Sequence, residues 1–185
     1  QSLPFFRKSI YGEAIWNSGI YGLSLFKSGE LLRVGEVHVG SETRIFLRWK
    51  GQDTGTFANI RIEIGDEITK GVRDSLVLRQ LGGRSGFLTV QQVIEELDRL
   101  GHHRFMGFEG HDWYGKYEPL DIEIKMMHCP VLKWPLLVEF EKTAGTMEEA
   151  RRWEIELGSF THQFDLEDRL IHDEPPTLLY SARFA

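Results

Sequence analysis

Alternation of apolar and polar residues is the clearest pattern in the first third of the chain. In residues 44–50 the apolar Ile45, Leu47 and Trp49 alternate with a second set, Arg44, Phe46, Arg48 and Lys50, of which three are charged. The same period of two returns at residues 60–64. Successive side chains of a strand point to opposite faces, so this period predicts strands with one apolar and one ionic face. The ionic face either meets bulk water or lines an enclosed polar lumen.

Further strands are predicted on both sides of this stretch. Residues 8–51 have the short apolar runs of an antiparallel meander, with turn signals at Asn17-Ser18-Gly19, Ser28-Gly29 and Gly40-Ser41. Two more alternating segments follow at residues 120–127 and 136–142. The sheet therefore carries many ionic positions.

Two helices are predicted with both a start and a stop signal. Each begins with a Thr that is followed three residues later by Gln or Glu, and each ends at a Gly: Thr89, Gln92 and Gly101 in the first, Thr146, Glu149 and Gly158 in the second. A further short helix is indicated before the Gly-rich break at Leu81-Gly82-Gly83, because Ile68, Val72 and Leu76 recur at every fourth position. Strands and helices together predict an α+β fold.

Composition limits the classes of function. With 185 residues, 41% of them hydrophobic, the chain is long enough for one globular domain over residues 1–185. Its formal charge of -6 argues against a broad nucleic-acid or anionic-membrane surface, although a local basic pocket stays open. No apolar run approaches the length of a transmembrane span, so a membrane-spanning protein is not expected.

Cysteine content and the first residue bear on the compartment. Cys129 is the single cysteine, which excludes an internal disulfide and favours an intracellular, reducing compartment. The chain starts at Gln1 instead of Met, which indicates either a truncated sequence or a removed leader such as an organelle transit peptide. The second alternative makes a mitochondrial location one of the expectations.

Seven short segments, in their order along the chain, resemble the CYTH superfamily. They are ELLRVG (30–35), RWKG (48–51), NIRIEI (59–64), EELDRLG (95–101), LDIEI (120–124), VEFE (138–141) and the EEA of 148–150. These triphosphate tunnel proteins include class IV adenylate cyclases and thiamine triphosphatases. The resemblance implies an antiparallel β-barrel with flanking helices, in which inward Arg and Lys hold a triphosphate and Glu residues bind Mg²⁺ or Mn²⁺.

The resemblance assigns six residues to the expected site. The phosphate-binding positions are Arg33, Lys50 and Arg61, and the metal-binding positions are Glu63, Glu139 and Glu141. A triphosphate needs fixed cationic groups, and hard divalent metals need carboxylate oxygens in the same cavity. Considered without the resemblance, the same side chains are also typical of the solvated face of a half-buried sheet.

Departures from the family pattern point to a degenerate site. Residues 1–16 contain no acid-x-acid-x-Lys strand, so the N-terminal strand is missing or divergent, and Gly35 stands where the family has a second arginine. Glu109 and His111 occupy a later basic pair. Further cations would have to come from other positions: Arg44, Arg48, Arg104, Lys116 or Lys125.

These departures favour an accessory or structural subunit of a larger complex with other protein subunits, for which a mitochondrial location is one of the expectations. A triphosphate is the candidate ligand, and no nucleic acid is expected. The alternative is a metal-dependent triphosphate hydrolase or adenylate cyclase of the tunnel type. An active enzyme would need Mg²⁺ or Mn²⁺, and an inactive protein would need no cofactor. The catalytic residues stay unassigned.

Overall fold

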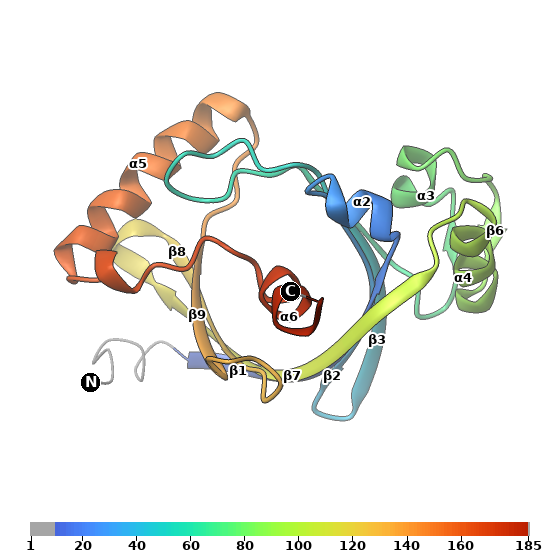
Figure 1. Cartoon of the computed structure of the whole chain (residues 1–185), viewed down its shortest axis with the longest axis horizontal. Helices are drawn as coiled ribbons and strands as arrows, with labels where there is room; N and C mark the ends of the chain where they lie inside the picture. The colour runs from blue at the N-terminus through green and yellow to red at the C-terminus, as the bar shows by residue number, and fades with distance from the viewer. Residues whose placement is uncertain (1–9, 185) are drawn as a thin grey trace. The chain divides into compact units, whose positions relative to one another are not determined.

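The computed structural model describes residues 10–184 as a mixture of strands and helices (Figure 1). The strands are β1 (Ile10–Tyr21), β2 (Leu31–Val39), β3 (Glu42–Lys50), β4 (Glu63–Glu67), β5 (Val72–Arg73), β6 (Phe87–Leu88), β7 (Arg104–Tyr117), β8 (Ile122–His128) and β9 (Leu136–Glu141). The α-helices are α2 (Leu23–Lys27), α3 (Leu76–Gln80), α4 (Val90–Arg99), α5 (Met147–Gln163) and α6 (Pro175–Phe184). Two 3₁₀ helices, η1 (Glu118–Leu120) and η2 (Glu167–Arg169), complete the set.

The main sheet confirms the predicted α+β class with antiparallel strands. Its order is β4-β3-β2-β1-β7-β8-β9, and β5 and β6 form a separate two-stranded sheet. The expected barrel is not closed within residues 10–184, because β4 and β9 stand at the two ends of this order. No helix in that range is long and apolar enough to cross a membrane.

The described part of the chain consists of two compact units. Unit 1 comprises residues 10–13, 53–60 and 111–184, and unit 2 comprises residues 14–52 and 61–110. The loop 53–60 therefore belongs to unit 1, although the strands β3 and β4 that it joins belong to unit 2.

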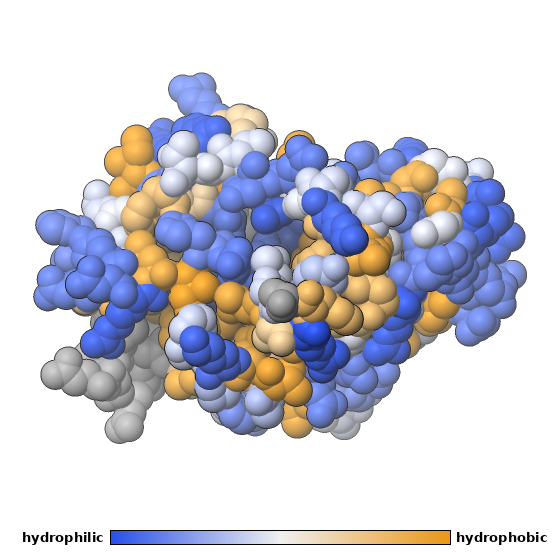
Figure 2. Space-filling model, in the orientation of Figure 1, coloured by the Kyte–Doolittle hydropathy of each residue, from blue (hydrophilic) through white to orange (hydrophobic). Residues whose placement is uncertain are grey.

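The core of unit 2 lies between its sheet and helices α3 and α4 (Figure 1). Leu32 of β2 and Leu47 and Trp49 of β3 share this core with Val93 and Leu97 of α4. Hydrophilic residues predominate on the surface over the two helices (Figure 2). The apolar half of the alternation is thus the packed half, so the charged positions of β2 and β3 lie on the opposite face.

The core of unit 1 lies between β8, β9 and α5. Ile122 and Ile124 of β8 and Phe140 of β9 pack with Phe160 of α5. The Phe140 and Phe160 ring centroids are 5.0 Å apart. Because these strand residues are even-numbered, the odd-numbered residues of β8 and β9 lie on the face away from α5.

Helix starts and several strands agree with the sequence. Thr89 and Gln92 form both halves of a capping box at α4, and the Thr146 side chain accepts a hydrogen bond from the backbone of Glu149 at α5. The strands predicted at 120–127 and 136–142 correspond to β8 and β9. Of the predicted meander, residues 8 and 9 lie outside the described range. The long strand β7 was not predicted.

The short helix predicted before Leu81-Gly82-Gly83 is confirmed only in its last part, as α3, and residues 68–75 are not helical. A right-handed helix is interrupted there by Gly71 and Asp74, whose φ angles are 84° and 54°. Helix α3 starts only at Leu76, where Asp66 accepts hydrogen bonds from the Ser75 hydroxyl at 2.6 Å and the Val77 N–H at 3.0 Å. The three apolar residues of this period belong to different segments: Ile68 follows β4, Val72 lies in β5, and Leu76 is the exposed first residue of α3.

One of the three predicted turns is also wrong. Strand β1 continues through Asn17-Ser18-Gly19. Gly19 lies under a side chain of another strand: a Cβ there would stand 2.9 Å from Nε of Arg104. The chain turns instead at Gly22, with φ of 69°. The turns at Ser28-Gly29 and Gly40-Ser41 are confirmed.

Candidate functional site

Two arginines lie directly opposite each other on the ionic face of unit 2. Strands β2 and β3 pair antiparallel, and their register places Arg33 opposite Arg48 and Leu31 opposite Lys50. The next strand adds Gly65 opposite Arg48 and Glu63 opposite Lys50. Arg33, Arg48 and Lys50 therefore share the face that is turned away from the helices.

The arginine pair has little side-chain bulk beside it. Gly65, opposite Arg48, has no side chain, and a Cβ there would lie 3.5 Å from Cγ of Arg48. Gly35 follows Arg33 on the same face and also has no side chain, and a Cβ there would lie 3.0 Å from Oγ of Ser18. The Arg48 guanidinium lies 4.9 Å from the centroid of the Phe46 ring. Within the described residues Arg33 has no ion-pair partner.

The remaining predicted groups of unit 2 make contacts within the protein. Lys50 Nζ lies 2.8 Å from Oε1 of Glu63, and the Lys50 side chain is only 16% exposed. Arg61 precedes β4, and its Nη1 donates to the carbonyl oxygens of Gly29 at 2.7 Å and Gly51 at 2.9 Å. Arg61 thus joins two chain segments, while Lys50 stays on the ionic face.

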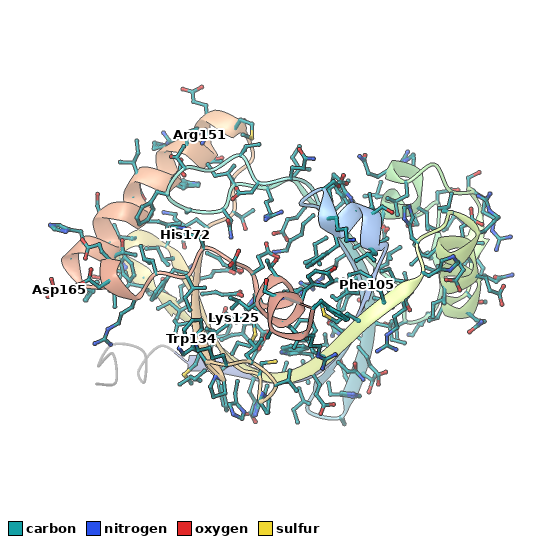
Figure 3. All side chains as sticks on the ribbon, viewed as in Figure 1. Phe105, Lys125, Trp134, Arg151, Asp165 and His172 are labelled. Carbon is teal, nitrogen blue, oxygen red and sulfur yellow. The ribbon has the colours of Figure 1, made fainter. Side chains whose placement is uncertain are left out.

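In unit 1 the predicted metal-binding acids surround a lysine. Lys125 of β8, labelled in Figure 3, forms an ion pair with Glu139 and lies 3.6 Å from Oε1 of Glu141. The register places Glu139 opposite Lys125 and Glu141 opposite Glu123. Nearby, Lys116 lies 2.5 Å from Asp121, and their hydrogen bond raises the pKa of Lys116 and lowers that of Asp121.

The predicted metal-binding carboxylates are engaged in ion pairs. Each of the three predicted metal ligands, Glu63, Glu139 and Glu141, lies within 4.0 Å of a lysine nitrogen. Residues 10–184 contain no group of three His, Cys, Asp or Glu side chains that could hold a metal ion. The register also brings two guanidinium groups, those of Arg33 and Arg48, to directly opposite positions, and such a pair suits an anion.

The sequence could have placed Arg48 beside Arg33. Residues at equal distances from the Gly40-Ser41 turn pair with each other in a hairpin, and Arg33 and Arg48 are equally distant from it. Lys125 was named only among several alternative cations. The connection between β8 and β9 is longer than a tight turn, so the sequence does not fix the register that brings Lys125 to Glu139. The turn of the first hairpin is the signal that was available and was not used.

Comparisons of the sequence find no match, whereas comparison with solved structures identifies similar folds. No protein-family model matches the chain, and no curated protein matches it in sequence. The solved structure of the PH1819 protein of Pyrococcus horikoshii superposes with a TM-score of 0.75 at 18% identity, over 96% of this chain and 91% of that one.

Two further solved structures have names that mention an activity. A candidate adenylate cyclase of Vibrio parahaemolyticus superposes with a TM-score of 0.63 at 12% identity, over 92% of this chain and 83% of that one. The HpAC1 protein of Hippeastrum, a candidate adenylyl cyclase described with a dominant triphosphatase activity, gives 0.60 at 11%, over 98% and 89%. At these identities the likeness shows the fold alone, and that fold is the CYTH type, the triphosphate tunnel architecture that the sequence resembles.

Proposed function

We propose that this chain binds a triphosphate or a longer polyphosphate through Arg33, Arg48 and Lys50, and that it does so without efficient turnover. The observation that carries this proposal is the register of β2 and β3, which sets Arg33 directly opposite Arg48. Like charges directly opposite on a sheet cost stability, about 0.2–1 kcal/mol. An anion between the two guanidinium groups would convert this repulsion into binding energy, since arginine forks match phosphate oxygens.

Neutralised carboxylates support the absence of efficient turnover. Phosphoryl transfer in metal-dependent enzymes uses carboxylates to hold divalent ions against the phosphate. Here Glu63 is paired with Lys50, and Glu139 and Glu141 are paired with Lys125. A metal ion would have to displace these lysines first. The accessory role in a larger assembly stays a prediction.

The binding test compares three arginine variants. We expect Arg33→Ala and Arg48→Ala each to weaken the binding of inorganic tripolyphosphate about tenfold or more, because each removes a charge-assisted contact. Arg44→Ala is the matched control, since Arg44 lies on the same strand but is exposed and paired with Glu42 at 2.7 Å. Titration calorimetry measures all four proteins. Equal affinities in all four, or no binding by the wild type, would contradict the proposal.

Turnover is tested separately. We expect release of phosphate and pyrophosphate from ATP, thiamine triphosphate and tripolyphosphate to stay well below about 1 s⁻¹ with Mg²⁺ or Mn²⁺, the lower end of ordinary enzymes. Lys50→Ala and Glu139→Ala serve as controls for contaminating activity. Faster turnover that both substitutions abolish would make the hydrolase or cyclase alternative the correct one.

A further inference from the structure

The loop of residues 53–60, here called the strap, is a closed turn held by its own first residue. Oδ1 of Asp53 accepts hydrogen bonds from the N–H groups of Gly55 and Ile60, each at 2.8 Å. The Thr54 N–H donates to the carbonyl of Ile60 at 3.0 Å. The strap therefore keeps its shape through local bonds, and its middle residues present free backbone donors outward.

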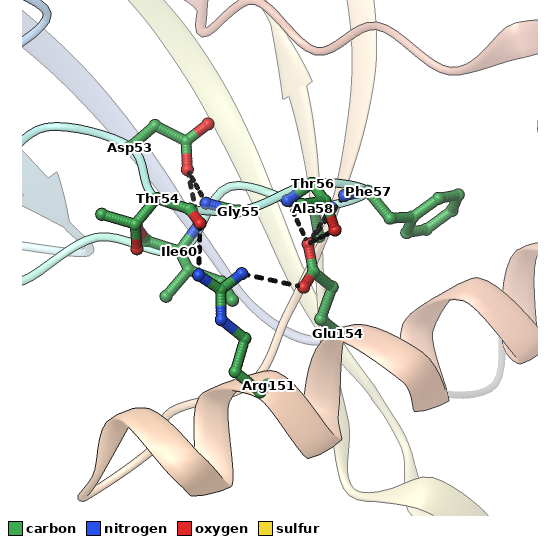
Figure 4. A network of polar contacts seen from close by, with 9 residues as sticks. All are labelled: Asp53, Thr54, Gly55, Thr56, Phe57, Ala58, Ile60, Arg151 and Glu154. Carbon is green, nitrogen blue, oxygen red and sulfur yellow. Dashed lines mark hydrogen bonds and ion pairs between the residues drawn. The ribbon is translucent and has the colours of Figure 1, made fainter.

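Helix α5 binds these donors through one carboxylate (Figure 4). Oε1 of Glu154 accepts from the N–H groups of Thr56 at 2.6 Å, Phe57 at 2.7 Å and Ala58 at 3.2 Å. Arg151, one turn earlier, donates to the carbonyl of Thr54 at 2.6 Å and lies 3.3 Å from Oε2 of Glu154. Three N–H groups on one carboxylate oxygen form the same kind of nest that binds anions elsewhere.

The electrostatics favour a permanently ionised Glu154. The residue is only 7% exposed. Burial acts to raise its pKa, but the hydrogen bonds from the strap and from Arg151 outweigh burial and lower the pKa to about 2. The contact between Glu154 and the strap therefore persists at every physiological pH.

A glycine on the same stripe of α5 gives the strap room to dock. Arg151, Glu154 and Gly158 follow at i, i+3 and i+7, so they share one face of the helix. A Cβ at Gly158 would stand 3.7 Å from the Phe57 ring. The prediction that the helix ends at Gly158 is wrong, since α5 continues to Gln163. A glycine inside a helix costs about 1 kcal/mol of stability. The close approach of the Phe57 ring explains why a residue without a side chain occupies this position.

The strap is also part of the chain segment that carries the candidate phosphate-binding residues. Two residues, Gly51 and Gln52, separate it from Lys50, and its last residue directly precedes Arg61. At its base the Gly51 N–H donates to the carbonyl of Ile62 at 2.8 Å, and Arg61 binds the Gly51 carbonyl at 2.9 Å. The strap is therefore joined to Lys50 by Gly51 and Gln52 alone.

We propose that Arg151 and Glu154 are positioning residues for polyphosphate binding, because they hold the strap on α5 and thereby fix the backbone on which Lys50 stands. This inference rests on the proposed function. Neither residue contacts the ligand. By linkage, a ligand bound at Lys50 must in turn stabilise the docked strap.

The experiment measures strap opening and ligand affinity in the same proteins. In Glu154→Ala and Arg151→Ala we expect faster hydrogen exchange of the strap amides and about tenfold weaker tripolyphosphate binding. Glu148→Ala and Arg152→Ala remove the same charges from exposed positions of α5 and should change neither quantity. Glu154→Gln keeps an oxygen that accepts from the strap, so we expect it to restore most of the affinity. In the wild type, tripolyphosphate should slow exchange of the strap.

The outcomes separate the two proposals. Faster strap exchange with unchanged affinity would overturn the positioning role and leave the proposed function standing. Loss of affinity in Arg33→Ala but not in Glu154→Ala would do the same. Absence of binding by the wild type would overturn both. Should Glu154→Ala fail to fold, Arg151→Ala and Phe57→Ala release the strap without removing the buried carboxylate, and the same criteria apply to them.

Discussion

Acidification from about pH 5 to about pH 2 is expected to lower the free energy of unfolding by about 1–2 kcal/mol for each of two buried carboxylates. Glu96 is 1% exposed and Glu154 is 7% exposed. In Glu96 the hydrogen bond from Arg99 acts against the effect of burial and, together with the hydrogen bond from the Arg84 N–H, lowers the pKa to about 2. Glu154 reaches a similar pKa through the strap.

The sign follows from the direction of both shifts. The unfolded chain takes up protons near the ordinary value of 4.5, while the folded protein keeps both groups ionised down to about 2. Their contribution is therefore complete above pH 4.5 and is lost as the pH falls toward 2. The arginines beside them are about half exposed, so solvent screening keeps the expected effect below the full value of the shifts.

Denaturant unfolding at a series of pH values measures this effect. Glu96→Gln and Glu154→Gln should each be less stable at neutral pH and should flatten the dependence between pH 4.5 and 2. Glu95→Gln is the matched control, because Glu95 is an exposed neighbour on the same helix. An unchanged pH dependence in the two buried variants would show that these carboxylates are not what makes the fold acid-sensitive.

The parts of the fold that were predictable are those specified by local sequence. Helix α4 has its start signal and its apolar face within a few residues, and the structure contains both. The hairpin of β2 and β3 has its turn at Gly40-Ser41 and alternates on both sides. Local sequence determines these elements, and contacts with distant parts of the chain favour the same structure.

Two of the errors share a physical cause, which is a glycine with a distant partner. Gly19 resembled a turn residue because the sequence does not show that Arg104 covers it. Gly158 resembled a helix stop because Phe57 lies about a hundred positions away along the chain. A glycine can mark a turn, a helix end or a close approach, and only the tertiary fold separates the third from the first two.

The candidate site was predictable to the same extent. Alternation places Arg33, Lys50 and Glu63 on one face, and the paired register agrees. Arg61 breaks this pattern because it precedes the strand and binds carbonyl groups. Glu154 was missed because its partners are backbone N–H groups, which have no signature in a sequence.

Replacing Lys125 by methionine is expected to produce the second large effect, a protein that is both less stable and responsive to metal. Lys125 is 19% exposed and contacts Glu139 and Glu141, and Glu123 lies opposite Glu141. Lys125→Met keeps most of the side-chain volume but leaves these acids without their cation. We expect a loss of about 1–3 kcal/mol, below the value for fully buried pairs because Glu141 is half exposed.

Divalent ions should restore part of that loss, because Glu139 and Glu141, once released from Lys125, offer the oxygen ligands that Mn²⁺ and Mg²⁺ prefer. Thermal unfolding with and without Mn²⁺ measures this directly, since an ion that binds only the folded state raises Tm. The matched control is Lys116→Met, which releases only Asp121 and should not create a metal response. If Mn²⁺ stabilises the wild type as much as Lys125→Met, then Lys125 does not block metal binding. The carboxylates Glu139 and Glu141 would then be available to a metal-dependent triphosphatase, and the inactive state proposed above would lose its physical basis.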